Sequence, residues 1–249
     1  MRHLHAIARL LHAVGLALQG WWIIRRRFEL MDDARRATEV ERWARRMLRV
    51  LGIQLLVQGE PPPARTPLLL ISNHISWLDI LVLHAARHVR FVSKSAVKGW
   101  PFIGLMATAA GTLYIERERR RDAMRVVHHM TEALRNGDRL AVFPEGTTSD
   151  GRVLLPFHAN LLQAAISAGV PVLPAALRFV DAATGQTSFA PRYVDEDTLL
   201  SSLWRTLCAP PLLAIVRYGQ LQDSHGRDRR EWAQSLYADV TALREQAVP

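Results

Sequence analysis

Residues 68–79 read Leu68-Leu-Leu-Ile-Ser-Asn-His-Ile-Ser-Trp-Leu-Asp79, and this stretch decides how the chain folds. The stretch begins with an unbroken apolar run, 68–71, which is typical of a strand buried on both faces. It ends within the apolar segment 78–83, which we expect to be helical. The stretch therefore predicts a strand that ends in a turn and continues as a helix.

This turn decides whether a histidine, His74, can reach a carboxylate, Asp79. On one helix, five steps of about 100° would place them about 140° apart, and on one strand they would lie on opposite faces. They meet only if the chain bends between them, with Asp79 in the first turn of a helix, where a carboxylate is favoured. Asp79 would then fix the tautomer of His74 and leave the other ring nitrogen free to accept a proton. The same spacing also fits two residues that cap a turn separately.

Short apolar runs recur along the chain and alternate with helical segments. We expect strands at 53–57, 68–71, 89–92, 112–115, 140–143, 170–173, 175–180 and 213–216. Helical periodicity is found at 36–51, 123–134, 161–168 and 228–244. This alternation predicts an α/β fold with a mostly parallel or mixed central sheet flanked by helices. Residues 181–210 show neither pattern and are expected to form an irregular insertion.

The N-terminal segment 6–24 is mostly apolar and nearly long enough to span a bilayer. Trp21-Trp22 followed by Arg25-Arg-Arg27 is typical of a membrane interface with a basic cytoplasmic flank. We expect no cleaved signal peptide, because no small-residue cleavage site follows the apolar run. Arg9 and His12 interrupt this run, so a shallow anchor, a full span and a core helix all fit.

The next segment, 36–51, is a basic amphipathic helix, which fits either a membrane surface or the surface of the main domain. The two segments together predict a two-helix membrane-associated hairpin over residues 1–51. A catalytic domain is then expected over residues 52–249.

Composition limits the partners and the compartment. The formal net charge of +9 favours anionic partners, namely phosphates, lipid surfaces or nucleic acid. Only 7% of the residues are aromatic and no nucleic-acid motif is found, so we expect no specific nucleic-acid partner. The single cysteine, Cys208, excludes an internal disulfide and fits a reducing compartment. Because no Cys/His cluster has zinc spacing, we expect no metal or other cofactor.

Polar residues follow four successive predicted strands: Asn73-His74, Lys94, Glu116-Arg117 and Pro144-Glu145-Gly146-Thr147. Ligands of open α/β sheets bind beyond the carboxyl ends of the strands, so these residues are expected to share one site. Arg117 could bind a phosphate with two parallel hydrogen bonds. The arginine run 117–121 also fits a solvated helix start, and 143–147 also fits a plain turn.

Four motifs, in this order, resemble those of the glycerolipid acyltransferases, above all the bacterial 1-acylglycerol-3-phosphate acyltransferases. They are Asn73-His74-x4-Asp79, Gly111-Thr-Leu-Tyr-Ile-Glu-Arg117, Phe143-Pro-Glu-Gly-Thr147 and Val170-Pro-Val-Leu-Pro174. The resemblance covers about residues 68–180. It implies that His74 is the catalytic base and that Asp79 orients it.

The resemblance also implies a set of substrate-binding residues: Asn73, Lys94, Arg117, Glu145, Gly146, Thr147 and Pro174. Arg117 would contact a phosphate of the acceptor, with Lys94 near the same pocket. Glu145 and Gly146 would shape the acceptor site, and Pro174 would line the acyl-binding region.

Two departures from the family pattern concern the acceptor. The third motif often continues with arginine, whereas this chain has Thr148-Ser149-Asp150, and a lysine often stands where this chain has His158. The loss of two cations weakens the case for a phosphomonoester. The run 147–151 also resembles acyltransferases that act on lyso-ornithine lipid.

The sequence thus predicts an O-acyltransferase that moves a fatty acyl group from acyl-CoA or acyl carrier protein to a lysolipid hydroxyl. The first acceptor expected is 1-acyl-glycerol-3-phosphate, which would give phosphatidate, and the alternative is lyso-ornithine lipid. The partners expected are these substrates and an anionic membrane surface, at the cytoplasmic face of a bacterial inner membrane. One alternative mechanism uses Ser76 as a nucleophile. The alternative functions are a thioesterase or lipase, a membrane-recruitment module and a non-catalytic nucleic-acid binding protein.

Overall fold

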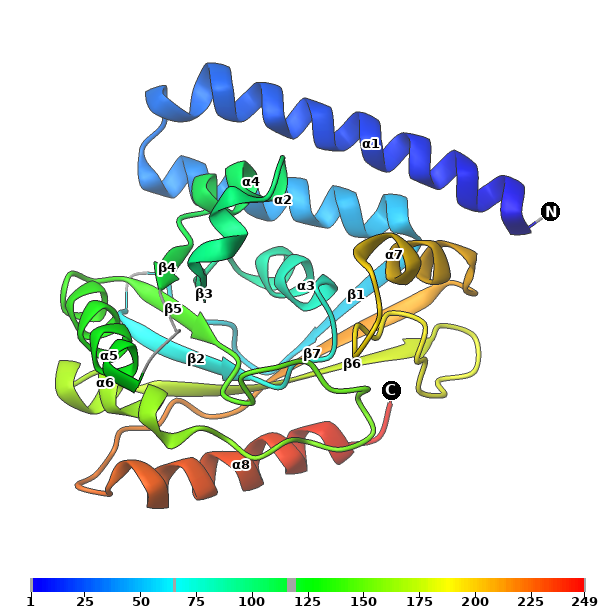
Figure 1. Ribbon diagram of the computed structural model, residues 1–249. Helices are drawn as coiled ribbons and strands as arrows, with labels where there is room; N and C mark the ends of the chain where they lie inside the picture. Colours follow the sequence, from blue (N-terminus) through cyan, green and yellow to red (C-terminus); the bar gives the residue numbers. More distant parts are fainter. Residues whose placement is uncertain (1, 65, 116–119, 249) are drawn as a thin grey trace.

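The computed structural model describes residues 2–64, 66–115 and 120–248, and a single sheet organises this part of the chain (Figure 1). Its seven strands lie in the order β1-β7-β6-β2-β5-β3-β4. Neighbouring strands are parallel except for β6 and β7, which are antiparallel. The strands are β1 (Ile53–Gln58), β2 (Leu68–Ser72), β3 (Arg90–Lys94), β4 (Leu113–Ile115), β5 (Arg139–Val142), β6 (Val172–Asp181) and β7 (Leu212–Tyr218).

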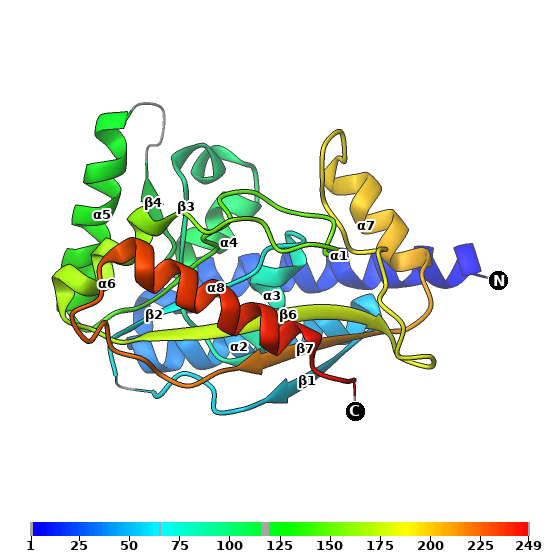
Figure 2. The ribbon, with the colours of Figure 1, turned by 90° about the horizontal axis from the view of Figure 1, so that it is seen from below.

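Helices cover both faces of the sheet (Figures 1 and 2). One face packs against α1 (Arg2–Arg27), α2 (Asp33–Leu51), α3 (Leu78–Ala86) and α7 (Leu199–Cys208). The other face packs against α5 (Arg120–Arg135), α6 (Leu162–Ala168) and α8 (Arg229–Glu245). The short helix α4 (Ile103–Ala109) lies beside α1, and the 3-10 turns are Phe28–Leu30, Ser95–Gly99 and Ala159–Leu161. The predicted α/β fold is confirmed.

Strand β2 lies at the centre of this arrangement, because all five of its residues are buried. Leu68 and Leu70 point into the apolar core beneath α2 and α3, whereas Leu69 and Ile71 point into the core beneath α5 and α8. Alternating side chains of a strand face opposite sides, so a strand between two helical layers must be apolar throughout. The run quoted from the sequence has this property.

The N-terminal hairpin is packed onto the domain. Ala6, Ala13, Leu16 and Gly20 of α1 are buried. A Cβ at Gly20 would lie 2.7 Å from the Trp43 indole, so this glycine allows a close approach to α2. The indole of Trp43 in α2 donates to the Leu16 carbonyl at 3.0 Å. Because Leu48 of α2 belongs to the same apolar core as the strands, the boundary at residues 51/52 stays a prediction.

Two sequence predictions need correction. The runs 170–173 and 175–180 form one strand, β6, which passes through Pro174. The regular ladder between β6 and β7 begins at Ala175, and before it the Pro174 carbonyl accepts the Gly219 N–H at 2.8 Å. The missing N–H of Pro174 therefore falls at an irregularity in the pairing, a position that tolerates proline. The insertion 181–210, expected to be irregular, contains the helix α7, which begins with a Thr198/Ser201 capping box.

The close pairing of β1 with β7 gives a test of the fold. Gly59 has a φ of +77°, and a Cβ at this position would lie 2.3 Å from the Tyr218 carbonyl oxygen. We expect Gly59→Ala to lower the free energy of unfolding by roughly 2–4 kcal/mol, measured by urea denaturation. Gly137→Ala is the matched control, because Gly137 also has a positive φ but no neighbour near the new methyl group. Equal losses in the two variants would contradict the close approach.

Candidate active site

The central feature of the site is a hydrogen bond across the turn that follows β2. His74 lies beyond the strand end, and Asp79 lies in the first turn of α3. The Nδ1 atom of His74 is 2.8 Å from Oδ2 of Asp79. The geometry predicted from the spacing is therefore confirmed: the chain bends, and the two side chains meet.

The Asp79 carboxylate also holds the turn itself. The same Oδ2 atom accepts the backbone N–H groups of Ile75 at 2.6 Å and Ser76 at 2.9 Å, and the side chain is fully buried. Capping the turn and orienting the imidazole are thus two effects of one oxygen atom. The other oxygen, Oδ1, is buried without a hydrogen-bond partner among the described residues.

The serine in this turn does not face a substrate. Ser76 is fully buried, and its hydroxyl accepts the backbone N–H of Leu78 at 3.3 Å. The alternative of a Ser76 nucleophile is therefore not supported.

The third motif fixes the backbone of His74. Glu145 accepts the His74 N–H at 2.6 Å with one carboxylate oxygen and the Leu155 N–H at 2.8 Å with the other. The Ser149 N–H donates to the His74 carbonyl at 2.8 Å. Glu145 is only 3% exposed, so its carboxylate positions the histidine from behind.

Phe143 fixes the plane of the imidazole. The two rings stack with centroids 3.8 Å apart and an angle of 5° between them, and Phe91 stacks on the far side of Phe143 at 5.7 Å. The side chain of His74 is 18% exposed, and within the described residues nothing is bonded to its Nε2 atom. That nitrogen is therefore available to a substrate proton.

The pKa of Glu145 is raised because burial disfavours the carboxylate, and the two backbone N–H donors and the charge of Arg244 oppose the shift. A raised pKa means that the folded protein takes up the proton at a higher pH than the unfolded chain does. By linkage, such a group makes the fold relatively more stable as pH falls through the raised value, and the ionised form that accepts both backbone N–H groups is lost over the same range.

Two of the expected substrate-binding residues have structural partners instead. The Asn73 amide donates to the Leu177 carbonyl at 3.0 Å and accepts the Leu177 N–H at 2.7 Å, so it ties the end of β2 to β6. Pro174 is buried, and its ring lies close to Gly219, next to Leu243 of α8. His74 stacks on the opposite face of the sheet, and contact between Pro174 and an acyl chain stays a prediction.

The other expected residues that the structure describes lie on the surface, at or beyond the carboxyl ends of the strands. Lys94 is exposed at the carboxyl end of β3, Gly146 and Thr147 are exposed beyond β5, and the ring of His158 lies against Gly146. Their contact with an acceptor stays a prediction. Arg117 lies outside the described residues. Across 2–64, 66–115 and 120–248, no three His, Cys, Asp or Glu residues gather as a metal site would need.

Comparison with known proteins gives the family. The acyltransferase family model matches residues 54–178, which span the turn, Glu145 and most of the sheet. A lyso-ornithine lipid O-acyltransferase of Pseudomonas aeruginosa is 36% identical over 100% of this chain and 96% of that protein. This chain belongs to the acyltransferase family.

Two further relatives of the acyltransferase widen the comparison. A 1-acyl-sn-glycerol-3-phosphate acyltransferase of Neisseria meningitidis is 38% identical over 80% of this chain and 78% of that protein. The crystal structure of the 1-acyl-sn-glycerophosphate acyltransferase from Thermotoga maritima matches with a TM-score of 0.66. It is 20% identical and covers 97% of this chain and 100% of that chain, so it supports the fold.

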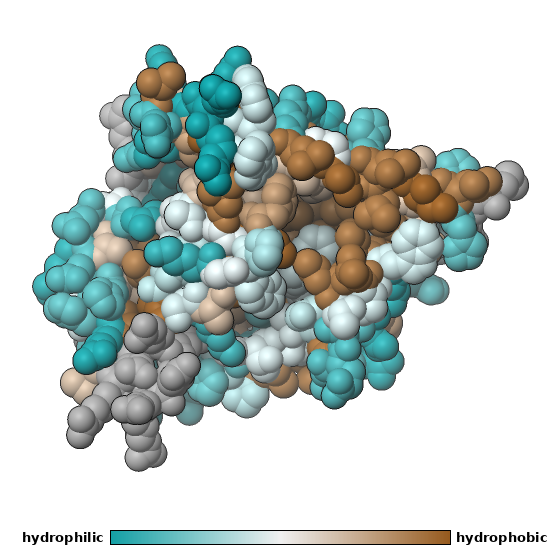
Figure 3. Space-filling view, turned by 45° about the horizontal axis from the view of Figure 1, so that its top comes forward, coloured by the Kyte–Doolittle hydropathy of each residue, from teal (hydrophilic) through white to brown (hydrophobic). Residues whose placement is uncertain are grey.

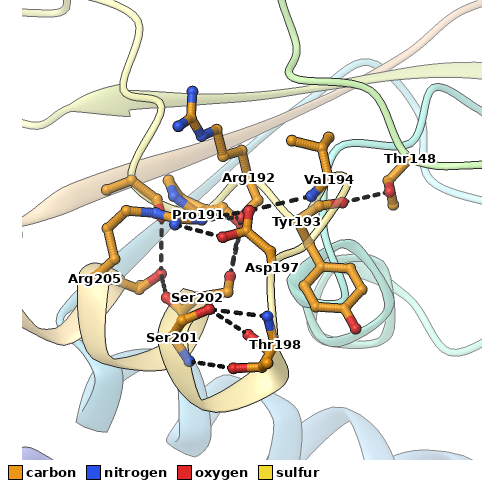
Figure 4. A network of polar contacts seen from close by, with 12 residues as sticks. Thr148, Pro191, Arg192, Tyr193, Val194, Asp197, Thr198, Ser201, Ser202 and Arg205 are labelled. Atoms are coloured by element: carbon orange, nitrogen blue, oxygen red, sulfur yellow. Dashed lines mark hydrogen bonds and ion pairs between the residues drawn. The ribbon is translucent and has the colours of Figure 1, made fainter.

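The insertion of the acyltransferase is bonded to the turn that carries His74. Figure 4 shows the contacts within the insertion and the bond between Thr148 and Tyr193. Tyr193 donates its N–H to the Ile75 carbonyl at 3.1 Å and receives the Thr148 hydroxyl at its own carbonyl. The Trp77 indole donates to the Ser202 hydroxyl of α7 at 3.3 Å. The position of α7 is therefore linked to the turn that carries His74 by one backbone hydrogen bond and one hydrogen bond between side chains.

An ion pair fixes the insertion internally. Arg205 of α7 donates to both carboxylate oxygens of Asp197, at 2.8 and 3.1 Å, and also to the Ala190 carbonyl at 2.9 Å. The hydrogen bonds from Arg205 lower the pKa of Asp197. A lowered pKa keeps the pair charged at neutral pH, and its contribution to stability is lost only as pH falls through that lowered value.

The contact between Glu145 and His74 can be tested with a variant of the same size. Glu145→Gln turns one acceptor into a donor that faces a backbone N–H, so His74 should lose its position. We expect kcat to fall by about 10²-fold and the free energy of unfolding by about 1–3 kcal/mol, measured by steady-state acyl transfer and urea denaturation. Glu132→Gln, on the exposed face of α5, should change neither, and an unchanged kcat in Glu145→Gln would rule out this positioning role.

Proposed function

We propose that this acyltransferase moves a fatty acyl group from a thioester to the free hydroxyl of a lysolipid, with lyso-ornithine lipid as its acceptor. The observation that carries the reaction is the oriented His74, whose Nδ1 is bound by Asp79 and whose Nε2 is unbonded among the described residues. The acceptor rests on the relative that matches along the whole chain. This places lyso-ornithine lipid ahead of the 1-acyl-glycerol-3-phosphate expected first from the sequence.

In the proposed mechanism, Nε2 of His74 takes the proton of the acceptor hydroxyl as that oxygen attacks the thioester carbonyl. The C–S bond breaks, and the thiolate of acyl-CoA or acyl carrier protein leaves with the proton from the imidazolium. Asp79 stabilises this imidazolium, and Phe143 and Glu145 keep the ring in place. General-base catalysis of this kind contributes about 10²–10⁴-fold.

The residues after the third motif support an acceptor without a phosphomonoester. Thr148 bonds to the Tyr193 carbonyl and Ser149 to the His74 carbonyl, so these positions serve as backbone supports and bring no cation to the site. The Neisseria relative keeps 1-acyl-glycerol-3-phosphate as the second candidate.

We propose that the enzyme works at the cytoplasmic face of a bacterial inner membrane, where its acceptor resides. Among the described residues one helix, His3–Leu30, is long and apolar enough to cross a bilayer by length and composition. One side of this segment packs against α2, which favours a helix lying along the membrane surface. Arg25 and Arg27 cover the rings of Trp21 and Trp22 at its basic end, where anionic lipid would bind.

The proposal is tested by acyl transfer from acyl-CoA and from acyl carrier protein to lyso-ornithine lipid and to 1-acyl-glycerol-3-phosphate. We expect higher kcat/KM with lyso-ornithine lipid, and His74→Ala should lower it by about 10²–10⁴-fold because the base is lost. His129→Ala, on the exposed face of α5, is the matched control and should be fully active.

Each other outcome would contradict a different part of the proposal. A higher kcat/KM with 1-acyl-glycerol-3-phosphate would contradict lyso-ornithine lipid as the acceptor. Release of free fatty acid without any acceptor would indicate a thioesterase. Full activity of His74→Ala would show that His74 is not the catalytic base.

A further inference from the structure

The helix α1 is apolar on the side that faces solvent as well as on the side that faces α2. Six apolar side chains at alternating spacings of three and four residues are exposed: Leu4, Ile7, Leu11, Val14, Leu18 and Trp21. This spacing places them in one stripe along the helix. Figure 3 shows the apolar surface following α1 toward the N-terminus and a second apolar area beside it.

The helix α7 adds a second apolar face next to this stripe. Leu200 and Trp204, one helical turn apart, are 76% and 38% exposed. The Trp204 ring stacks on His3 of α1 with centroids 6.1 Å apart, and Cys208 also contacts His3. The exposed residues of α7 therefore continue the stripe of α1, although the two helices are almost 200 positions apart in sequence.

We propose that α7 is a second membrane-contact element, which inserts Leu200 and Trp204 into the interface of an anionic bilayer alongside α1. Tryptophans stand near both ends of the joint surface, Trp204 at one and Trp21 at the other, with aliphatic side chains between them, as expected for a protein face in a bilayer interface. The arginines 25–27 at one end complement lipid phosphates, which favours an anionic bilayer as the occupant.

This contact would act on catalysis through the bonds already described. Ser202 of α7 accepts a hydrogen bond from the Trp77 indole. Tyr193, in the loop before α7, donates its N–H to the Ile75 carbonyl. Trp77 and Ile75 both belong to the turn that carries His74. A bilayer bound at α7 therefore sets the height of the catalytic turn above the lipid, where a membrane-embedded acceptor presents its hydroxyl. This consequence for catalysis rests on the proposed function, whereas the membrane contact does not.

The contact is tested by flotation of the full chain with vesicles of phosphatidylglycerol and phosphatidylcholine, with no acceptor present. The double variant Leu200→Glu/Trp204→Glu should bind at least about fivefold more weakly, because two charges replace apolar side chains that the bilayer would bury. Leu221→Glu, an exposed leucine on the loop before α8, is the control and should bind like the wild type. Binding by the double variant equal to the wild type, or equal losses in the control, would overturn the proposal.

A second measurement does not depend on losing affinity. In a Cys208→Ser background, a polarity-sensitive dye on Leu200→Cys should shift to the blue on vesicle addition, and the same dye on Leu221→Cys should not. A blue shift at Leu200→Cys without vesicles that grows with protein concentration would indicate a second copy of the chain and would overturn the bilayer as occupant. Because neither experiment measures acyl transfer, failure here is distinct from failure of the proposed acceptor.

Discussion

One carboxylate oxygen holds together the turn that carries His74. Oδ2 of Asp79 receives two backbone N–H groups and the imidazole of His74, so the shape of the turn and the orientation of the imidazole have the same origin. Buried N–H groups without an acceptor are costly. The fold therefore keeps this aspartate in the first turn of α3, where the helix dipole also favours its charge.

The strands on either side of β2 support His74 and its neighbour Asn73. The strand β5 on one side leads to Phe143 and Glu145, which fix the ring and the backbone of His74. The strand β6 on the other side provides the Leu177 backbone to Asn73. A site at the carboxyl edge of the central strands is the usual consequence of a parallel sheet. Here it means that His74 is held by the distant segment that follows β5, and the neighbouring Asn73 by β6.

The sequence predicted those features that local patterns determine. Apolar runs marked all the strands, and the spacing of His74 and Asp79 required the bend between them. The roles of Asn73 and Pro174 depend on strand register and on which face of the sheet each side chain meets, and neither is encoded locally. The helix α7 was missed although its Thr198/Ser201 capping box is a local signal, whereas the contacts of Arg205, Asp197 and Trp77 that fix its position exist only in the folded chain. Phe143 could have been noticed, since it directly precedes Pro144-Glu145, but an aromatic before a turn has no specific meaning by itself.

The bonds that fix His74 and its neighbour also impose an order of assembly. The contact between Glu145 and His74 closes a loop of 71 positions, and the contact between Asn73 and Leu177 closes one of 104. Contacts this distant form late, after much chain entropy has been lost. A nascent or partly unfolded chain can therefore expose the apolar stripe of α1 before the imidazole of His74 is held in place.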